Sequence, residues 1–590
     1  MNFSLRSFLA KPLRWIKATE GARRRRRRAS EYLSHIKSLA EGEGTAAQTL
    51  PPFVSLLVPV FNTKPHYLNQ LLASVRAQLP GSWELILSDD GSTEPTTRRW
   101  LERHQSAPDI KILRHPENCG IVAATNAAIA VAKAPWITFL DHDDLLTPNA
   151  LATIQRALTS ARDCCFLYTD EVIADAKGRP VDFFLKPAFD PVLLSGVNYL
   201  NHLSLYRRDR VLALGGLRKD FEGSQDHDLA LRYTRTLGPG QALHLPYPAY
   251  IWRRDGQSYS ARFMDKATRN ARKSLAEAFE REGCRPQVDA APGGLHRIRF
   301  DQVCTEWPLV SVVIPSRNAF ELIDRLLSGL CECTNYPNLE IIVIDNGSID
   351  PKVLALYERL RNGVIPFQAV IESEPFNFSL SINKGVAKAK GDYVLWLNND
   401  IEMREPDWLR EMVSCFAYPN VGIVGAKLLY PNGTHQHAGV IVGFGGLAGH
   451  WFLETPEDFP GPMGRLWVRQ SFSAVTGACM LVSRACFEAV GELDEGLFAI
   501  GYNDVDFCLR SRERGFRVVW TPFATLIHHE SASRGSDETE ANIARFQLEQ
   551  ENLRRRHATD RYDDFAISPW YSKDRSLPEP MRLSKLPEAR

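Results

Sequence analysis

Closely spaced carboxylates give this sequence its clearest chemical signal. Residues 141–144 read Asp-His-Asp-Asp and follow the apolar run 135–140. Carboxylates this close repel one another unless a cation lies among them. Hard oxygen ligands suit Mg²⁺ or Mn²⁺, and such an ion would in turn hold a diphosphate. The alternative is a solvated acidic loop that caps the helix expected over 148–161.

The same pattern occurs a second time along the chain. Residues 89–92 (Asp-Asp-Gly-Ser) return as residues 345–348 (Asp-Asn-Gly-Ser), 256 positions later, and the run ending at Asp143 returns as Trp-Leu-Asn-Asn-Asp, ending at Asp400. Asp-Gly alone is ordinary turn chemistry. A period this long means two whole domains rather than a solenoid.

A third acidic site also occurs in both copies. Asp226 and Asp504 each stand before a helical pattern, with a further acid, Asp228 or Asp506, two positions later. Helix capping alone explains such an aspartate. A helix N-terminus also favours the ionised carboxylate, which is what a general base needs. The offset here is 278, against 257 between Asp143 and Asp400, so copy two carries 21 additional residues between these two sites.

Histidines add a further set of candidate ligands in copy two. His528 and His529 follow an apolar run, and an imidazole there would complete a metal shell with some preference for Mn²⁺. His435, His437 and His450 form another group. A zinc site at that group is the weaker alternative, because no cysteine accompanies it at useful spacing.

These residues need a scaffold that brings strand ends together. In copy one, strand-length apolar runs alternate with helical patterns, which predicts an α/β fold with a mostly parallel sheet covered on both faces. Ligands bind such sheets beyond the carboxyl ends of the strands. The expected strands are 54–60, 85–88 and 135–140, and the expected helices are 67–78, 96–105 and 121–133.

Composition limits the class of protein. The 590 residues are 44% hydrophobic and 24% charged, with a formal net charge of +1, which is ordinary for globular protein and argues against a nucleic-acid partner. No apolar stretch approaches the about 18 residues of a spanning helix. Eleven scattered cysteines favour a reducing compartment, and the N-terminus lacks a secretory apolar region. We expect a cytoplasmic protein, peripheral at most to the cytoplasmic face of the inner membrane.

The N-terminal segment stands apart from the repeat. Leu9, Leu13 and Ile16 have helical spacing, and six consecutive arginines occupy residues 23–28. Apolar side chains at the interface with arginines against anionic headgroups would make a peripheral membrane anchor of residues 1–28. A solvated tail is the alternative.

The repeat sets the expected domain boundaries. They are a basic amphipathic segment over 1–52, a first domain over 53–262, a helical or hairpin linker over 263–307, a second domain over 308–535 and a C-terminal helix and tail of low order over 536–590.

Together these motifs resemble glycosyltransferase family 2, whose members use the nucleotide-sugar fold called GT-A, and the resemblance covers both copies. Copy two resembles O-antigen rhamnosyltransferases through residues 503–510 and 528–535. The resemblance implies catalytic bases at Asp226 and Asp504. It implies metal ligands at Asp141, Asp143, Asp400, His528 and His529. It implies nucleotide-sugar contacts at Pro59, Asp89, Asp90, Asp141, Pro315, Asp345, Asn346 and Asn398.

The resemblance also implies an activity. The expected reaction is an inverting transfer from a UDP-, dTDP- or GDP-linked sugar to a bacterial surface glycan such as a lipid-linked O-antigen. It needs a metal such as Mn²⁺ or Mg²⁺ and one carboxylate base per site. Two departures are Asn398, where the metal motif has its first Asp, and Ile251, where relatives often have His. They favour the alternative in which only one copy is catalytic and the other binds or scaffolds. A nucleotidyltransferase is less favoured, because its glycine-rich, arginine-containing N-terminal loop is absent.

Overall fold

The computed structural model describes residues 21–37, 51–79, 81–254, 264–300, 306–530, 540–574 and 580–581. The chain forms two compact units. Unit 1 comprises Met1–Phe189, Asn198–Glu282 and Glu579–Arg590, and unit 2 comprises Asp190–Val197 and Gly283–Pro578. Residues 9–16 and the expected end of the first domain at 255–262 lie outside the described residues.

Unit 1 is built on a sheet with the strand order β3-β2-β1-β4-β8-β6-β9-β5, and β7 pairs with β6. The neighbours of β1 and the pair β6–β9 are parallel, whereas β8 runs antiparallel to both of its neighbours. The strands are β1 (Val54–Val60), β2 (Trp83–Asp89), β3 (Ile110–Arg114), β4 (Trp136–Phe139), β5 (Leu145–Leu146), β6 (Phe166–Ala174), β7 (Pro180–Phe184), β8 (Ser204–Arg207) and β9 (Ala242–Arg253).

Helices cover this sheet because its central strands are apolar on both faces. Six of the seven residues of β1 are buried, as expected of a parallel strand packed between helices. The helices are α2 (Pro65–Arg76), α3 (Pro95–His104), α4 (Ile121–Val131), α5 (Ala150–Ser160), α7 (Arg208–Ala213), α8 (Gln225–Thr234) and α10 (Met264–Glu280). The predicted strands and helices of copy one are therefore confirmed, with shifts of a few residues at their ends.

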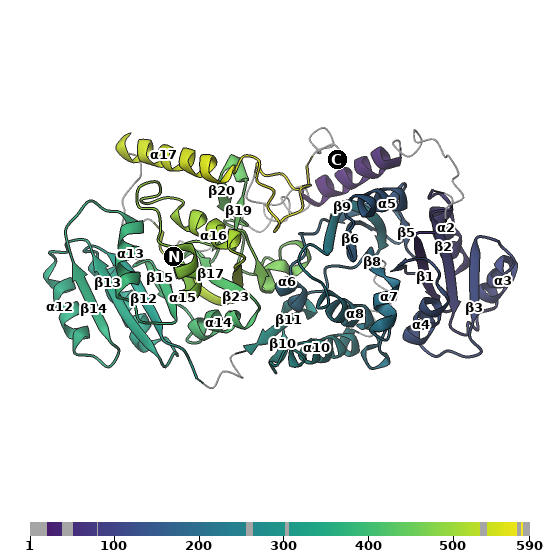
Figure 1. The fold of residues 1–590 in the computed structure, drawn as a ribbon, viewed down its shortest axis with the longest axis horizontal. Coiled ribbons are helices and arrows are strands. Elements are labelled where there is room, and N and C mark those ends of the chain that lie inside the picture. The colour runs from purple at the N-terminus through teal and green to yellow at the C-terminus, as the bar shows by residue number, and fades with distance from the viewer. Residues whose placement is uncertain are drawn as a thin grey trace, which may run out of the picture. The chain divides into compact units, whose positions relative to one another are not determined.

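Unit 2 repeats the sheet with the order β14-β13-β12-β15-β22-β17-β23-β16 (Figure 1). Its principal strands are β12 (Val310–Ser316), β13 (Leu339–Asp345), β14 (Phe367–Ile371), β15 (Tyr393–Leu397), β16 (Ile401–Met403), β17 (Val421–Leu429), β22 (Cys479–Ser483) and β23 (Arg517–His528). Its helices are α11 (Phe320–Glu332), α12 (Pro351–Arg361), α13 (Phe378–Lys388), α14 (Trp408–Ser414), α15 (Arg484–Val490), α16 (Asn503–Glu513) and α17 (Glu540–His557). Position by position, this is the order of unit 1, so the sequence repeat is a repeat of the fold.

The additional residues of copy two build short strands between β17 and β22. They are β18 (His435–His437), β19 (Val440–Val442), β20 (Ala448–His450) and β21 (Gln470–Ser471). β18 pairs with β17, and β19 pairs with β20 in a sheet of their own. The insertion therefore places its histidines in regular structure.

One short helix of copy one belongs to unit 2. Helix α6 (Pro191–Gly196) is capped by Asp190, whose carboxylate accepts hydrogen bonds from the backbone N–H and the hydroxyl of Ser471 at 2.7 and 2.8 Å. Ser195 and Tyr418 join their hydroxyls at 2.8 Å. Unit 2 is therefore incomplete without residues that precede it by about a hundred positions in the chain.

The segment expected as a linker is divided between the units. Helix α10 packs in unit 1, where Ser274 donates to Asp228 at 2.8 Å. The hairpin of β10 (Gln287–Ala290) and β11 (His296–Arg299) packs in unit 2, where Arg297 pairs with the buried Glu411 at 3.0 Å. The described part of the linker thus completes both units and does not form a separate spacer.

Both terminal segments also pack onto their units. Residues 21–37 form a helix that buries Tyr32 against the Phe183 ring, with centroids 5.6 Å apart, and pairs Arg25 with Asp182 at 2.8 Å. Helix α17 confirms the predicted C-terminal helix. The expected tail of low order is corrected for residues 558–574, because Asp564 is buried and accepts from the Val442 N–H at 2.7 Å. Within the described part of the chain, no helix has the length and apolarity needed to cross a bilayer.

Candidate active site

The aspartates that end β2 and β13 occupy equivalent places in the two sheets. Asp89 accepts from the Ser92 N–H at 3.1 Å, and Asp345 accepts from the Ser348 N–H at 2.6 Å. Asp345 also accepts from the Ser348 hydroxyl and the Tyr357 hydroxyl, both at 2.7 Å. Each carboxylate is therefore fixed at the carboxyl end of a buried parallel strand, where nucleotide ligands bind such sheets.

The next residue in each copy holds a neighbouring loop. The Asp90 carboxylate accepts from the backbone N–H groups of Cys119 and Gly120, at 2.8 and 2.9 Å. The Asn346 side-chain oxygen accepts from the Glu374 N–H at 3.0 Å. These side chains organise the loop before α4 or α13, so they shape the edge of the sheet. Contact with a nucleotide remains a prediction for both.

The strand prolines lie beside these acids. Pro59 is next to last in β1 and is in register with Ser88, and Pro315 has the same place in β12, in register with Ile344. Asn398 follows β15 and donates its backbone N–H to Ala478 at 3.0 Å. Direct contact of these three residues with a nucleotide sugar also stays a prediction.

In unit 1, the acidic loop is anchored from β9. Tyr250 donates its hydroxyl to Asp144 at 2.8 Å and accepts the Asp141 N–H at 3.2 Å, while the Arg253 N–H donates to Asp144 at 2.7 Å. Burial raises the pKa of Asp144 well above its usual range, and the charges of Asp141 and Asp143 raise it further. Asp144 is thus the anchor of the loop, and Asp141 and Asp143 remain the candidate ligands.

A histidine that no sequence motif marked lies against this loop. His202 places Nε2 3.6 Å from Asp141 Oδ2 and Nδ1 3.7 Å from Glu171 Oε2, and its ring stacks on Tyr250 with centroids 4.9 Å apart. Burial alone would lower its pKa, but Glu171 and Asp141 raise the pKa of His202 to about 9. Unit 1 therefore carries a cationic imidazole at its acidic edge.

The predicted base of unit 1 lies at the same edge. Asp226 is the second residue of α8 and accepts from the amides of Asn201 and Asn198, at 2.6 and 3.2 Å. Desolvation raises the pKa of Asp141, and nearby Asp143 and Asp226 contribute to that rise against the opposing effect of His202. The fold thus brings together Asp141 and Asp226, which are distant in sequence.

The second acid on α8 has a different role. Asp228 is buried and pairs with Arg218 and Arg232, whose Nε atoms lie 3.0 and 2.9 Å from its carboxylate. Burial would raise the pKa of Asp228, but these arginines hold it below its usual value. Asp228 therefore stabilises the helix, while Asp226 meets only neutral amide donors.

In unit 2, an aspartate and a histidine meet at the end of β23. His528 Nε2 lies 3.2 Å from Asp400 Oδ1, and both side chains are buried. Among the residues that the structure describes, neither Asp400 Oδ1 nor His528 Nδ1 has a hydrogen-bond partner. An unsatisfied carboxylate oxygen beside an imidazole fits a divalent cation, which would satisfy both.

The other predicted ligand turns elsewhere. His529 Nε2 lies 2.7 Å from Glu402 and 3.0 Å from Arg325 Nη1. Across the described ranges, no three His, Cys, Asp or Glu side chains converge as a metal-binding group. Substrate oxygens and water would therefore complete any shell at Asp400 and His528, as is usual for Mg²⁺ at phosphate sites.

The strand registers match the two copies residue by residue. Leu145 is opposite Ile251 in unit 1, and Glu402 is opposite Ile527 in unit 2. Leu145 and Glu402 each stand two residues after the last aspartate of the repeated run, Asp143 or Asp400. Ile251 therefore corresponds to Ile527, and Trp252 is the residue in the place of His528. The departure from relatives at Ile251 stays an expectation of the resemblance.

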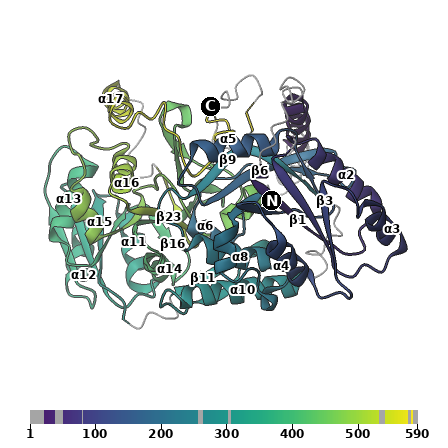
Figure 2. The same cartoon turned by 45° about the vertical axis from the view of Figure 1, so that its right-hand side comes forward.

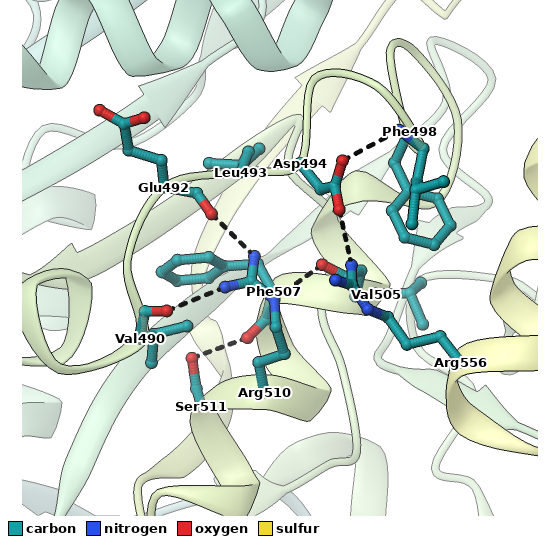
Figure 3. Close-up of polar contacts among 12 residues, drawn as sticks. Val490, Glu492, Leu493, Asp494, Phe498, Val505, Phe507, Arg510, Ser511 and Arg556 are labelled. Carbon is teal, nitrogen blue, oxygen red and sulfur yellow. Dashed lines mark hydrogen bonds and ion pairs between the residues drawn. The ribbon is translucent and has the colours of Figure 1, made fainter.

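The predicted base of unit 2 has surroundings like those of the predicted base of unit 1. Asp504 is the second residue of α16 and accepts from the Gly477 N–H at 2.8 Å. Asp506 is buried, with Arg510 Nε and His557 Nε2 both 2.8 Å away. Figure 3 shows Arg510 directed at the backbone carbonyls of Val490 and Glu492. One acid again stabilises the helix, and within the described part of the chain the other accepts only from backbone amides, those of Gly477 and Val505.

The inserted histidines lie close to this base. His437 Nδ1 is 3.0 Å from His450 Nδ1, whereas His435 Nδ1 faces Thr455. Burial lowers the pKa of His437 well below its usual value and also lowers that of His450, although the charge of Asp504 acts on His450 in the opposite direction. The zinc alternative therefore lacks one of its three expected ligands.

Comparison with known proteins gives one family. The model described as Glycosyl transferase family 2 matches residues 55–187 and 311–491. An uncharacterized protein of Sinorhizobium fredii, y4gI, is 37% identical over 89% of this chain and 58% of its own length. The O-antigen biosynthesis protein RfbC of Myxococcus xanthus is 36% identical over 84% of this chain and 39% of its own. The chain thus spans about half the length of these curated relatives.

Solved structures give a weaker similarity. The mannosyltransferase PcManGT of Pyrobaculum calidifontis, in complex with GDP-Man and Mn²⁺, has a TM-score of 0.30 and 21% identity over 39% of this chain and 59% of its own. A fragment of S. aureus TarS in complex with UDP has a TM-score of 0.30 and 18% identity over 39% of this chain and 71% of its own.

Proposed function

Because the chain belongs to glycosyltransferase family 2, with two tandem GT-A units, we propose that both units transfer a sugar from a nucleotide-diphosphate donor to a growing bacterial surface glycan. The observation that carries the proposal is the pair of acids on one helix in each unit. Asp228 and Asp506 are ion-paired, whereas the donors that the described residues offer to Asp226 and Asp504 are all neutral amides. A carboxylate without a counter-cation is available to take a proton from an acceptor hydroxyl.

The proposed mechanism is a single displacement with inversion. Asp226 or Asp504 takes the proton of the acceptor hydroxyl, and that oxygen attacks the anomeric carbon from the face opposite the leaving diphosphate. One base per site suffices, because no enzyme nucleophile is needed. In unit 1, the His202 imidazolium adds positive charge where the diphosphate would leave, which stabilises the developing negative charge.

The donor would be held along the carboxyl edge of each sheet. Asp89 and Asp345 would accept from the nucleotide, and a bound Mn²⁺ or Mg²⁺ would neutralise the diphosphate as a Lewis acid. Asp141 and Asp143 would hold that ion in unit 1, and Asp400 with His528 would hold it in unit 2. The resemblance of copy two to rhamnosyltransferases supports a deoxyhexose donor for unit 2.

The acceptor and location belong to the same proposal. A relative involved in O-antigen biosynthesis supports a lipid-linked glycan as acceptor. The helix over residues 21–37 directs Arg23, Arg26 and Arg27 to solvent while Tyr32 docks it on unit 1. This arrangement supports peripheral binding at the cytoplasmic face of the membrane, where such an acceptor would be presented.

A second candidate function is one catalytic unit and one that only binds. Unit 1 has Trp252 in the place of His528, and unit 2 has Asn398 in the place of Asp141. The test is donor hydrolysis by the full chain against UDP-, dTDP- and GDP-sugars with Mn²⁺, comparing Asp226→Asn with Asp504→Asn. Loss of a different donor activity with each variant would support two catalytic units. Complete loss with one variant and none with the other would support the alternative.

A further inference from the structure

The C-terminal helix α17 is hydrogen-bonded to the loop that precedes α16, the helix that carries the proposed base of unit 2. Glu549 is buried and accepts the Ile500 N–H at 2.8 Å, and Asn552 donates to the Leu497 carbonyl at 3.0 Å. Figures 1 and 2 both show α17 lying beyond α16 at the periphery of unit 2. The inward face of α17, which also buries Leu553, thus holds this loop through polar side chains.

An arginine of α17 completes the connection. Arg556 Nη1 lies 3.1 Å from both Asp494 and Asp506, and Figure 3 shows its side chain directed at Asp494. Asp506 is two residues from Asp504 on the same helix. The position of α17 relative to the proposed base is therefore fixed by buried polar contacts rather than by apolar packing alone.

The same region presents an aromatic pair beside the base. Phe546 of α17 is 41% exposed, and its ring stacks on Tyr502 with centroids 5.5 Å apart and an interplanar angle of 22°. Tyr502 immediately precedes α16, where burial raises the pKa of its hydroxyl and the charge of Asp504 adds to that rise. Two nearly parallel rings therefore stand within reach of the acceptor side of this site.

The backbone is arranged to bring these rings together. Tyr502 has a φ of +60°, a conformation that costs a bulky residue about 1 kcal/mol or more. Gly501 allows the close approach, because a Cβ there would lie 3.3 Å from the Phe546 ring and 3.0 Å from Glu549. Local preference does not explain this conformation, so the contacts with α17 must maintain it.

We propose that Tyr502 and Phe546 form an acceptor subsite of unit 2 that binds a sugar ring of the glycan. This deepens the proposed function and rests on it. An aromatic face suits the apolar C–H face of a pyranose, and the amide and carboxylate groups nearby suit its hydroxyls. Ile543 is also exposed, at 45%, and lies one turn from Phe546 on the same face of α17. The Tyr502 hydroxyl and the nearby Asp504 carboxylate give the patch a polar edge, which suits a sugar ring better than an acyl chain.

The test uses the full chain and saturation-transfer difference NMR with the methyl glycosides of L-rhamnose, D-mannose and N-acetyl-D-glucosamine as probes. At least one glycoside should receive saturation from the wild type through its ring C–H protons. Phe546→Ala should weaken that binding by about fivefold, and Phe546→Trp should restore it. Val364→Ala is the matched control, because Val364 is fully exposed on the connection before β14.

Three results would overturn the inference: no saturation of any glycoside, equal binding by Phe546→Ala, or equal loss in the control. Loss of binding to phosphatidylglycerol vesicles by Phe546→Ala, with unchanged glycoside saturation, would assign the patch to lipid instead. Failure of the proposed function is separate, because it would appear as absent donor hydrolysis while glycoside binding persists.

Discussion

Trp252 of unit 1 occupies the strand position that His528 occupies in unit 2. Unit 1 has its histidine on the other side of the acidic edge instead, since His202 precedes β8 at the place where unit 2 has Ala478. The two imidazoles also contact different carboxylates, Asp141 and Asp400. The same sheet therefore carries its imidazole–carboxylate contact at two different places, as expected if the two proposed transfer sites use different donors.

The first prediction concerns the metal of unit 2. His528→Ala should weaken Mn²⁺ binding by about tenfold or more, because it removes one of two buried donors. Titration of the full chain with Mn²⁺, followed by electron paramagnetic resonance, measures this directly. His529→Ala is the matched control, because its imidazole lies against Glu402. A larger effect of His529→Ala than of His528→Ala would contradict the geometry and would favour His529 as the ligand.

A second prediction separates the two acids of α16. Asp506→Asn should lower the free energy of unfolding by about 3 kcal/mol, because it removes one partner of a buried charge cluster with Arg510, Arg556 and His557. Asp504→Asn should leave the unfolding midpoint nearly unchanged while abolishing turnover. Urea unfolding followed by tryptophan fluorescence measures both. If Asp504→Asn unfolded the chain as readily as Asp506→Asn, Asp504 would be a structural residue and not a base.

Features that depend on neighbouring residues could be predicted from the sequence. Features that depend on contacts between distant segments could not. Strands such as β1 are set by short apolar runs, and strand-end acids such as Asp89 are set by local turn chemistry. The repeat gave a second, independent example of each. His202 and Tyr250 meet only through the pairing of β4, β8, β6 and β9, so no local pattern marks them.

The third prediction is that folding stability decreases both at acid and at alkaline pH, through two different histidines. Burial lowers the pKa of His437, so below pH 6.5 the unfolded chain binds a proton that the folded chain does not, and stability should fall as the pH decreases from about 7 to 5. The pKa of His202 is raised to about 9, so its contribution is complete below pH 6.5 and is lost as the pH rises through 9. Urea unfolding midpoints measured from pH 5 to 10 test both limbs.

Two variants assign those limbs. His437→Gln should reduce the slope of the unfolding midpoint against pH on the acid side and leave the alkaline side unchanged. His202→Gln should reduce the slope on the alkaline side and leave the acid side unchanged. The readout is the slope of the midpoint against pH, so a general loss of stability in either variant does not obscure it. An acid limb that persists in full with His437→Gln would show that this histidine is not buried in its neutral form.

A fourth prediction concerns the exposed arginines of the N-terminal helix. Replacing Arg23, Arg26 and Arg27 with serine should weaken binding to vesicles containing phosphatidylglycerol, at about 1 kcal/mol per arginine, and salt should weaken wild-type binding in the same way. Arg25 is left unchanged because it pairs with Asp182. Vesicle co-sedimentation is the measurement.

The control for that experiment removes equal charge elsewhere. Arg98, Arg99 and Arg103 are exposed on α3. Their replacement with serine should leave vesicle binding intact. Equal weakening by both triple variants would indicate a general effect of net charge, and it would contradict a membrane-binding role for the helix.

The last prediction follows from the position of α6. Asp190 accepts two hydrogen bonds from Ser471, and Ser195 meets Tyr418, so residues far upstream in the sequence complete unit 2. Asp190→Ala leaves the buried Ser471 N–H without its acceptor, which costs about 1–3 kcal/mol. It should therefore lower the unfolding midpoint of unit 2. Asp209→Ala, at an exposed acid at the start of α7, is the matched control and should change little.

The same contact decides how activity should be assigned. A fragment cut at the boundary near residue 308 would lack α6, so loss of activity in that fragment would report incomplete folding rather than the absence of a catalytic site. Point variants in the full chain avoid this ambiguity, because Asp226→Asn and Asp504→Asn leave the Asp190–Ser471 contact in place. If a fragment of residues 308–590 unfolded at the same urea concentration as unit 2 in the full chain, α6 would be dispensable and single-unit fragments would become valid tests.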